Sequence, residues 1–323
     1  MTLLQVKDLV HHFSTPRGTV QAVRGVDLAI EASQTVAVVG ESGSGKSTTA
    51  RAVARLTQPT AGEVLINGVD ILKAGRRKLR GIRRDVQMVF QDPYSSLDPR
   101  RTVGQSIQEP LDVYRVGTRK ERLLRVGELM ELVGLDRGRT NSLPVSMSGG
   151  QRQRVAIARS LALQPKLVIC DEAVSALDVS VQAQVLNLLS DLQTQLGVSY
   201  LFITHDLAVV SEVADIVAVM YLGRIVESGT RTQVLGNPQH PYTQALLSAA
   251  PGVDSHTQRI ILAGDAPSAL SPPTGCGFRL RCWRAQDLCA ESDPQLEARA
   301  TAVGLVSQPV ACHFPGSRPQ AKL

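Results

Sequence analysis

Aromatic residues are scarce in this chain, and no long apolar run occurs in it. Only 3% of its 323 residues are Phe, Trp or Tyr, which disfavours a base-stacking surface for nucleic acid. The most apolar region, 208–222, is broken by polar residues and is too short to span a bilayer. The first residues lack the basic and apolar blocks of a secretory signal. We therefore expect a soluble, cytoplasmic chain that reaches a membrane only through partners.

Cysteine is also rare. The chain has five cysteines, and because cytoplasmic thiols stay reduced, we expect no disulfide framework. Its net charge of +6 leaves polyphosphate and lipid headgroups open as partners. The basic run Arg76-Arg77-Lys78 and the pair Arg83-Arg84 are more typical of solvated faces than of binding sites.

The most informative motif follows the apolar run Thr35–Val39 and has the form G-x-x-x-x-G-K-S. Its glycines let successive backbone N–H groups surround a polyphosphate. Lys46 is then expected to reach the outer phosphates and Ser47 to bind Mg²⁺, while the helix begun by Ser47 and Thr48 directs its positive end at the nucleotide. The alternative is a Gly/Ser-rich turn between strand and helix. The motif reads Gly40-Glu41-Ser42-Gly43-Ser44-Gly45-Lys46-Ser47.

Three further polar sites lie where predicted strands end. Asp171 and Glu172 follow the apolar run Leu167–Cys170, so Asp171 can hold Mg²⁺ and Glu172 can act as general base. An Asp-Glu pair can also simply cap a strand. His205 is placed to contact the terminal phosphate and orient water, and Gln91 to contact Mg²⁺ and the water. By themselves, a lone loop histidine and a Gln before Asp-Pro carry no functional meaning.

The hydrophobic pattern predicts an α/β architecture. Residues 3–39 alternate as strands do, and residues 100–159 follow a helical pattern that indicates an insertion. Two buried parallel strands are separated by a helix, as a βαβ unit requires. These strands are Leu167–Cys170 and Tyr200–Ile203, and the helix is Val181–Leu196.

A second anion-binding helix N-terminus is predicted at the signature turn Ser148-Gly149-Gly150-Gln151, which opens a helix expected over Arg152–Leu163. Together with the motifs above and with Ser175-Ala176-Leu177-Asp178, it makes residues 3–235 resemble an ATP-binding-cassette (ABC) ATPase. The sequence departs from the family pattern at Ala173, where Pro is usual, and at Met147, where Leu or Phe is commoner.

The resemblance implies a P-loop NTPase core with an antiparallel β subdomain and a helical insertion of about residues 92–160. It also implies a head-to-tail dimer in which Lys46 of one subunit and Ser148 of the other close on the same ATP. Asp178 would then lie at the dimer seam, and Phe13 would stack on adenine.

The C-terminal part narrows the resemblance to the bacterial peptide-importer ATPases, and it is closest to the second ATPase subunit of dipeptide and oligopeptide permeases. The motifs that carry this resemblance are Phe90–Arg100, Val174–Gln184, His240–Leu247 and the cysteine segment. It implies an ABC ATPase domain over 1–240 and a Cys-containing extension over 241–323. The implied partners are a second, homologous ATPase, two transmembrane permease subunits and, indirectly, an extracytoplasmic peptide-binding protein, with the chain peripheral on the cytoplasmic face of the membrane.

Four cysteines in the extension, Cys276, Cys282, Cys289 and Cys312, have the form C-x5-C-x6-C-x22-C. Four soft ligands suit a [4Fe–4S] cluster or a tetrahedral zinc ion. Some members of the resembled subfamily carry the cluster, and unliganded thiols are the remaining alternative. Cys170, inside an apolar strand, is expected to pack as a small hydrophobe.

The sequence therefore predicts an ATPase that drives peptide uptake, with ATP and Mg²⁺ bound. The alternative function is a soluble ABC-type ATPase in nucleic-acid repair or translation, for which the positive charge is the argument. Such proteins usually resemble tandem cassettes or carry long coiled coils. Because the chain has one phosphate loop and no heptad tract, we expect no nucleic-acid partner.

Overall fold

The computed structural model describes residues 2–92, 96–250, 259–298, 300–301, 304–305 and 308–316. The chain divides into two compact units, each described here by itself. The helical unit comprises Met1–Leu3, Ile30–Gln34 and Lys73–Ile203. The phosphate-loop unit comprises Leu4–Ala29, Thr35–Leu72 and Thr204–Leu323.

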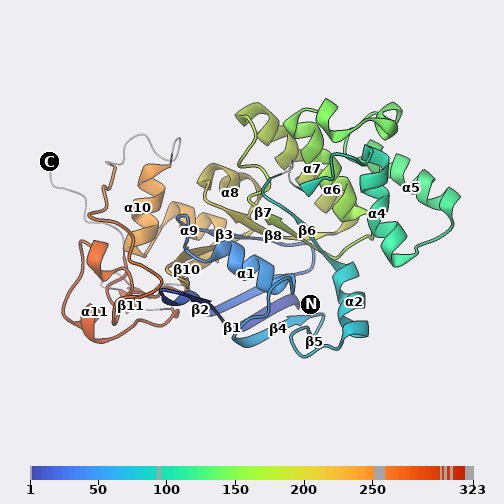
Figure 1. Cartoon of the computed structure of the whole chain (residues 1–323). Helices are drawn as coiled ribbons and strands as arrows, with labels where there is room; N and C mark the ends of the chain where they lie inside the picture. Colours follow the sequence, from blue (N-terminus) through green and yellow to red (C-terminus); the bar gives the residue numbers. More distant parts are fainter. Residues whose placement is uncertain are drawn as a thin grey trace. The chain divides into compact units, whose positions relative to one another are not determined.

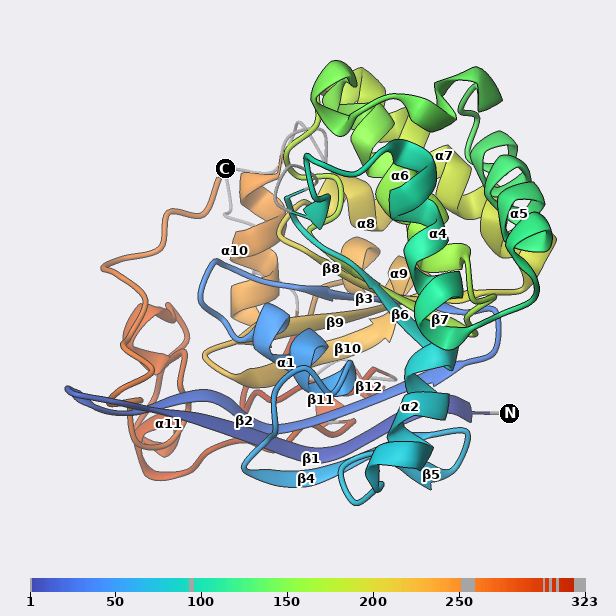
Figure 2. The ribbon, with the colours of Figure 1, turned by 45° about the vertical axis from the view of Figure 1, so that its right-hand side comes forward.

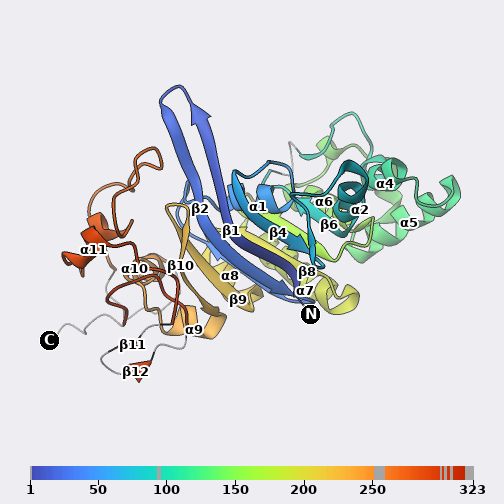
Figure 3. The same cartoon turned by 90° about the horizontal axis from the view of Figure 1, so that it is seen from below.

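A four-stranded antiparallel sheet, in the order β2-β1-β4-β5, belongs mainly to the phosphate-loop unit. The first two strands form the long hairpin of Figure 3, and alternate residues of β1 are buried over much of its length, which gives the sheet an apolar face. The β1 register against β4, with Leu4 opposite Ile66, shifts between Lys7 and Val10. The strands are β1 (Thr2–Thr15), β2 (Gly18–Glu31), β4 (Ala61–Ile66) and β5 (Val69–Asp70).

Three more strands of this unit hold the phosphate loop. All five residues of β3 (Thr35–Val39) are buried, and β3 pairs in parallel with β9 (Ile216–Tyr221). The strand β10 (Arg224–Thr230) then pairs antiparallel with β9, as expected around Gly223. The helices of this part are α1 (Lys46–Val53), α8 (Leu207–Val213) and α9 (Arg231–Gly236).

The C-terminal extension lies beside β10 (Figure 1), where the Ala311 N–H donates to the Val226 carbonyl at 2.8 Å, and it has only short elements of its own. The rings of Tyr221, Tyr242 and Phe278 form one aromatic cluster, with centroids 4.6 to 5.5 Å apart. Phe278 and Tyr242 are almost fully buried there, so the extension depends on the ATPase strands for its core. Its elements are α10 (Pro241–Ala249), the 3₁₀ turn η3 (Arg279–Arg281), α11 (Leu288–Glu291), β11 (Ala300–Thr301) and β12 (Gly304–Leu305).

A buried carboxylate joins β10 to the chain around α10. Glu227 is fully buried and accepts the backbone N–H groups of Gln239, at 2.7 Å, and His240, at 3.0 Å, as well as the side-chain amide of Gln308, at 2.5 Å. Hydrogen bonds to both carboxylate oxygens offset part of the cost of burying the charge.

The helical unit contributes three parallel strands, in the order β8-β7-β6, with Met88 opposite Ile169 and Ile169 opposite Leu201. Helices α4 to α7 gather on one side of them (Figure 2). Side-chain capping boxes start α4, α5 and α6, at Thr102, Thr118 and Ser148. The elements are α2 (Arg76–Asp85), β6 (Val86–Val89), α4 (Val103–Tyr114), α5 (Arg119–Leu132), η1 (Arg137–Asn141), η2 (Pro144–Ser146), α6 (Gly149–Leu161), β7 (Leu167–Asp171), α7 (Val179–Leu196) and β8 (Ser199–Thr204).

The predicted α/β architecture with an antiparallel subdomain and a helical insertion is confirmed. The βαβ unit is present, although α7 begins at Val179, two residues before the predicted start. The basic run at Arg76 forms a helix in which no residue is buried, as expected of a solvated face. None of the helices in the described ranges is long and apolar enough to cross a membrane.

His240 makes the stability of the extension sensitive to acid. It is buried, its Nδ1 accepts the Tyr242 N–H at 3.0 Å as the cap of α10, and burial lowers its pKa to about 3. Below about pH 6.5 the His240 imidazole is therefore protonated in the unfolded chain but not in the folded chain. The free energy of unfolding falls as the pH drops from 6.5 toward 3.

We expect the His240→Asn variant, which keeps a capping acceptor but cannot be protonated, to lose less stability over this pH range. The predicted difference is at most about 1.4 kcal/mol per pH unit, measured by urea unfolding at several pH values. Burial raises the pKa of Glu227, but both proteins share that titration. Parallel curves for the two proteins would contradict the prediction.

Candidate nucleotide site

The phosphate loop lies so close to neighbouring backbone that two of its positions admit only glycine. A Cβ added at Gly40 would collide with the carbonyl oxygen of Met220 in β9, and one at Gly45 with the carbonyl oxygen of Ala22 in β2. Gly43, by contrast, has a φ of +78° and open space beside it. The Gly223 N–H donates to the Ser44 carbonyl at 2.8 Å and fixes the loop from the β9–β10 turn.

Lys46 begins α1 and is only 4% exposed. Its ammonium donates to the carbonyl oxygens of Gly40 and Glu41, both at 2.8 Å, so it is turned back across the loop. Ser47 and Thr48 follow it in the first helical turn and are half-buried, and Ser42 and Gly43 form the exposed tip. The loop therefore combines a buried cation, backbone N–H groups and a helix N-terminus, which together suit a polyphosphate.

Two other predicted residues belong to the same unit. His205 is exposed and follows directly on the end of β8, before Asp206, whose carboxylate caps α8 by accepting the Ala208 N–H at 2.8 Å. Phe13, on the β1–β2 hairpin, is 40% exposed and packs edge-on against His11, with ring centroids 4.5 Å apart. The stacking of Phe13 on adenine stays a prediction.

The helical unit brings Glu172, the predicted general base, together with Gln91. The Gln91 side-chain amide donates to the Glu172 carboxylate at 2.7 Å. Asp171, the last residue of β7, is only 2% exposed, whereas Glu172 has a left-handed φ of +50°. Such a conformation is uncommon for a residue with a side chain and often occurs at functional sites.

The signature turn is built as a capped helix start. The Ser148 side chain accepts the Gln151 N–H at 3.3 Å, and the Gln151 side chain accepts the Ser148 N–H at 3.1 Å. Gly149 and Gly150 are the first two residues of α6, which therefore begins three residues before the predicted start, Arg152. Asp178 is exposed directly before α7.

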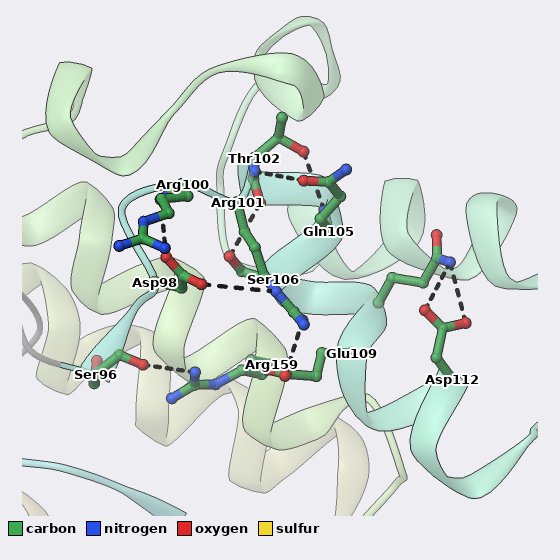
Figure 4. A network of polar contacts seen from close by, with 11 residues as sticks. Ser96, Asp98, Arg100, Arg101, Thr102, Gln105, Ser106, Glu109, Asp112 and Arg159 are labelled. Carbon is green, nitrogen blue, oxygen red and sulfur yellow. Dashed lines mark hydrogen bonds and ion pairs between the residues drawn. The ribbon is translucent and has the colours of Figure 1, made fainter.

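The chain at Ser96 is anchored to α6. Arg159 of α6 donates to the Ser96 carbonyl at 2.7 Å, and Arg101 pairs with Glu109 of α4 at 2.8 Å. Figure 4 shows these contacts and the Thr102 capping box that starts α4. A displacement of this segment is therefore resisted by both helices.

Three of the tail cysteines, Cys276, Cys282 and Cys312, have raised thiol pKa values. Burial raises the pKa of Cys276 to about 11 and that of Cys312 to about 12, and thiols of the set shift both pKa values further upward. In the described part of the chain, however, no group of three or more His, Cys, Asp or Glu side chains is arranged to hold a metal ion. The predicted [4Fe–4S] site is therefore not supported by this arrangement. Cys170 is fully buried in β7, as expected of a packed hydrophobe.

Sequence reasoning missed two contacts of the loop residue Glu41. Its N–H donates to the Tyr242 hydroxyl at 2.8 Å, and its carboxylate pairs with Arg281 at 2.9 Å. No local sequence signal marks these contacts, because their partners lie 201 and 240 residues away in the chain.

Comparison with known families and proteins gives consistent matches. The family model described as ABC transporter matches residues 23–175, and the one described as oligopeptide/dipeptide transporter, C-terminal region, matches residues 226–289. The dipeptide transport ATP-binding protein DppF of Escherichia coli is 49% identical over 303 residues, which cover 91% of each chain. The di/tripeptide transport ATP-binding protein DppF of Pseudomonas aeruginosa is 47% identical over 320 residues, which cover 97% of each.

Solved structures of ABC cassettes are also similar to this chain. The ATP-binding cassette MJ0796, in a dimeric post-hydrolysis state bound to ADP and Pi, is 30% identical with a TM-score of 0.65, and the match covers 71% of this chain and 98% of that one. The structure of cbiO1 from Clostridium perfringens is 28% identical, also with a TM-score of 0.65, over 73% of this chain and 91% of that one.

Glycine at position 40 is expected to be indispensable for nucleotide binding. In Gly40→Ala the new methyl group displaces the loop from Met220, so we expect the affinity for MgATP to fall at least about tenfold, a loss of about 1.4 kcal/mol. Gly43→Ala is the control, because it adds the same methyl group in open space, so its cost of about 1–2 kcal/mol for the left-handed backbone falls on folding stability and not on the position of the loop. Titration with a fluorescent ATP analogue measures both, and a smaller loss in Gly40→Ala than in Gly43→Ala would refute this prediction.

Proposed function

The chain belongs to the peptide-import ATP-binding proteins of the ABC transporter family, and on this basis we propose how its residues couple ATP hydrolysis to peptide uptake. The observation that carries the assignment to peptides is the match of residues 226–289 to the transporter C-terminal region, because the cassette alone serves many functions. The alternative of a soluble ATPase in nucleic-acid repair or translation is not favoured by these relatives.

The phosphate loop holds the triphosphate of ATP. Backbone N–H groups from Gly40 to Thr48 surround the phosphates, and Lys46 exchanges its loop carbonyls for phosphate oxygens, which are stronger acceptors for a cation. What supports this role is the burial of Lys46 beside the start of α1. Phe13 stacks on the adenine ring from its exposed position on the hairpin.

Hydrolysis is assigned to polar residues at strand ends. Glu172 takes a proton from the attacking water, while Gln91 and His205 orient that water. Ser47, Asp171 and Gln91 would hold Mg²⁺, which neutralises charge on the phosphates. The pairing of Gln91 with Glu172 supports this assignment, because the amide fixes the direction in which the carboxylate points.

A second cassette completes the site. We assign the signature residues Ser148, Gly149, Gly150 and Gln151 to the ATP held by the phosphate loop of a partner ATPase, and Asp178 to the dimer seam. The capped start of α6 supports this, because its N-terminus is preorganised to meet an anion. The proposed dimer is head-to-tail and, as in paired peptide-importer ATPases, formed with a homologous rather than an identical chain.

Permease subunits in the membrane are the other partners of this importer ATPase, which is a peripheral, membrane-associated subunit. We place it on the cytoplasmic face, with an extracytoplasmic binding protein delivering peptide. The helical insertion, about residues 92–160, transmits closure of the cassettes to the permeases. The bond from Arg159 to Ser96 supports this, because it ties the segment after Gln91 to the signature helix.

The extension, residues 241–323 beyond an ATPase domain of 1–240, is proposed to bind a [4Fe–4S] cluster through Cys276, Cys282, Cys289 and Cys312. What supports the proposal is the set of four soft ligands in one segment of the extension. As they stand, the side chains do not surround a metal, so we derive no step of the ATPase cycle through the cluster.

Replacement of Glu172 tests the hydrolytic assignment. We expect Glu172→Gln to lower ATP turnover about 10²- to 10⁴-fold while MgATP still binds, because only the base is lost. Phosphate release by the importer assembled with its permeases measures the rate. The control is Glu212→Gln, at an exposed position of α8. Turnover within twofold of wild type would show that Glu172 is not the base.

Anaerobic purification tests the cluster. We expect about four iron and four sulfide per chain and broad visible absorbance, both lost in Cys289→Ser. Colourless protein without iron, or protein loaded with zinc, would refute the cluster.

A further inference from the structure

The C-terminal extension touches the phosphate loop through the turn η3, which lies between Cys276 and Cys282. The Arg281 guanidinium donates to the Glu41 carboxylate at 2.9 Å. The Arg281 side chain is only 10% exposed and that of Glu41 33%, so water screens this pair less than an ordinary surface ion pair. Both residues belong to the phosphate-loop unit.

A second residue of the extension holds the same loop position. The Glu41 backbone N–H donates to the Tyr242 hydroxyl at 2.8 Å. Tyr242 is fully buried in the aromatic cluster with Tyr221 and Phe278, so its hydroxyl is a fixed acceptor. Burial also raises the pKa of Tyr242, which keeps the phenol neutral.

The third polar group of Glu41 faces the phosphate-binding lysine. Its carbonyl oxygen accepts a hydrogen bond from Lys46 Nζ at 2.8 Å. The N–H, the carboxylate and the carbonyl of one residue are therefore engaged by Tyr242, Arg281 and Lys46 in turn. A change at either extension contact is transmitted to the peptide that holds the lysine.

The turn that presents Arg281 is itself well fixed. The Arg281 N–H donates to the Phe278 carbonyl at 3.0 Å, and the Cys276 N–H donates to the Cys289 carbonyl at 2.8 Å. Because Phe278 is buried against Tyr221, the turn cannot move independently of β9. Arg281 thus acts from a rigid support, as a positioning group must.

We propose that Arg281 and Tyr242 are positioning residues of the ATP site, so that the extension sets the conformation of the phosphate loop through Glu41. The inference rests on the proposed binding of ATP by this loop. Neither residue is assigned a contact with ATP. Their role is to reduce the conformational freedom that the loop loses when it binds phosphate.

The experiment compares Arg281→Gln with Arg279→Gln in the full-length chain. Arg279 belongs to the same turn, but its guanidinium bonds to Thr274 within the extension, so it reports on the extension alone. We expect Arg281→Gln to raise the Kd for MgATP and the KM for ATP about three- to tenfold, with kcat within about twofold, since each tenfold corresponds to about 1.4 kcal/mol. Arg279→Gln is expected to leave all three unchanged. Equal affinities in the two variants would overturn the proposal.

A double-mutant cycle separates the contact from general damage to the extension. Glu41→Gln removes the same ion pair from the loop side, so it should weaken binding about as much as Arg281→Gln, and the double variant should be no weaker than either. Tyr242→Phe, which removes only the hydroxyl that accepts the Glu41 N–H, should also raise KM more than it lowers kcat. Additive effects in the cycle would refute the positioning role.

Lys46→Ala, measured in the same assay, separates this inference from the proposed function. Loss of MgATP binding in Lys46→Ala, together with wild-type binding in Arg281→Gln, would overturn the positioning role alone. Retained binding in Lys46→Ala would overturn the proposed ATP site and with it the inference.

Discussion

The close approach of the phosphate loop to two backbone carbonyls constrains the rest of the structure. Gly40 lies against Met220 of β9 and Gly45 against Ala22 of β2, so strands from two different sheets bound the loop. Backbone atoms cannot rotate away as side chains can, and the loop has one place to lie. Residues far apart in the chain must therefore fold together before a phosphate can be bound.

The two units contribute in different ways. In the phosphate-loop unit, the charge on Lys46 is balanced by carbonyl dipoles of its own loop, which a phosphate can replace. In the helical unit, the Glu172 carboxylate is held by the Gln91 amide, and the Ser96 carbonyl by Arg159 of α6. Both contacts lie inside this unit, so Glu172 and α6 belong to one packed body.

Much of the fold was predictable, because it depends on short-range patterns. The run Thr35–Val39 followed by glycines indicated a buried strand and a phosphate loop, and both are present. The start of α6 was predicted three residues late because Gly149 and Gly150 are poor helix formers, and the Ser148 capping box outweighs them. The roles of the individual site residues remain predictions. Long-range contacts left no pattern to find: Glu227 bonds to Gln308, 81 residues away, and Arg281 to Glu41, 240 residues away.

The position of Arg281 directly before Cys282 has a thermodynamic consequence. Binding equilibria that share one structural element are reciprocal, so each ligand alters the affinity for the other by the same factor. If Arg281 positions the loop as proposed, a ligand or oxidant at Cys282 that altered the turn η3 would also alter the contact with Glu41. Occupancy of the nucleotide loop and the chemical state of the tail thiols would then be coupled, and a titration of either one would record the other.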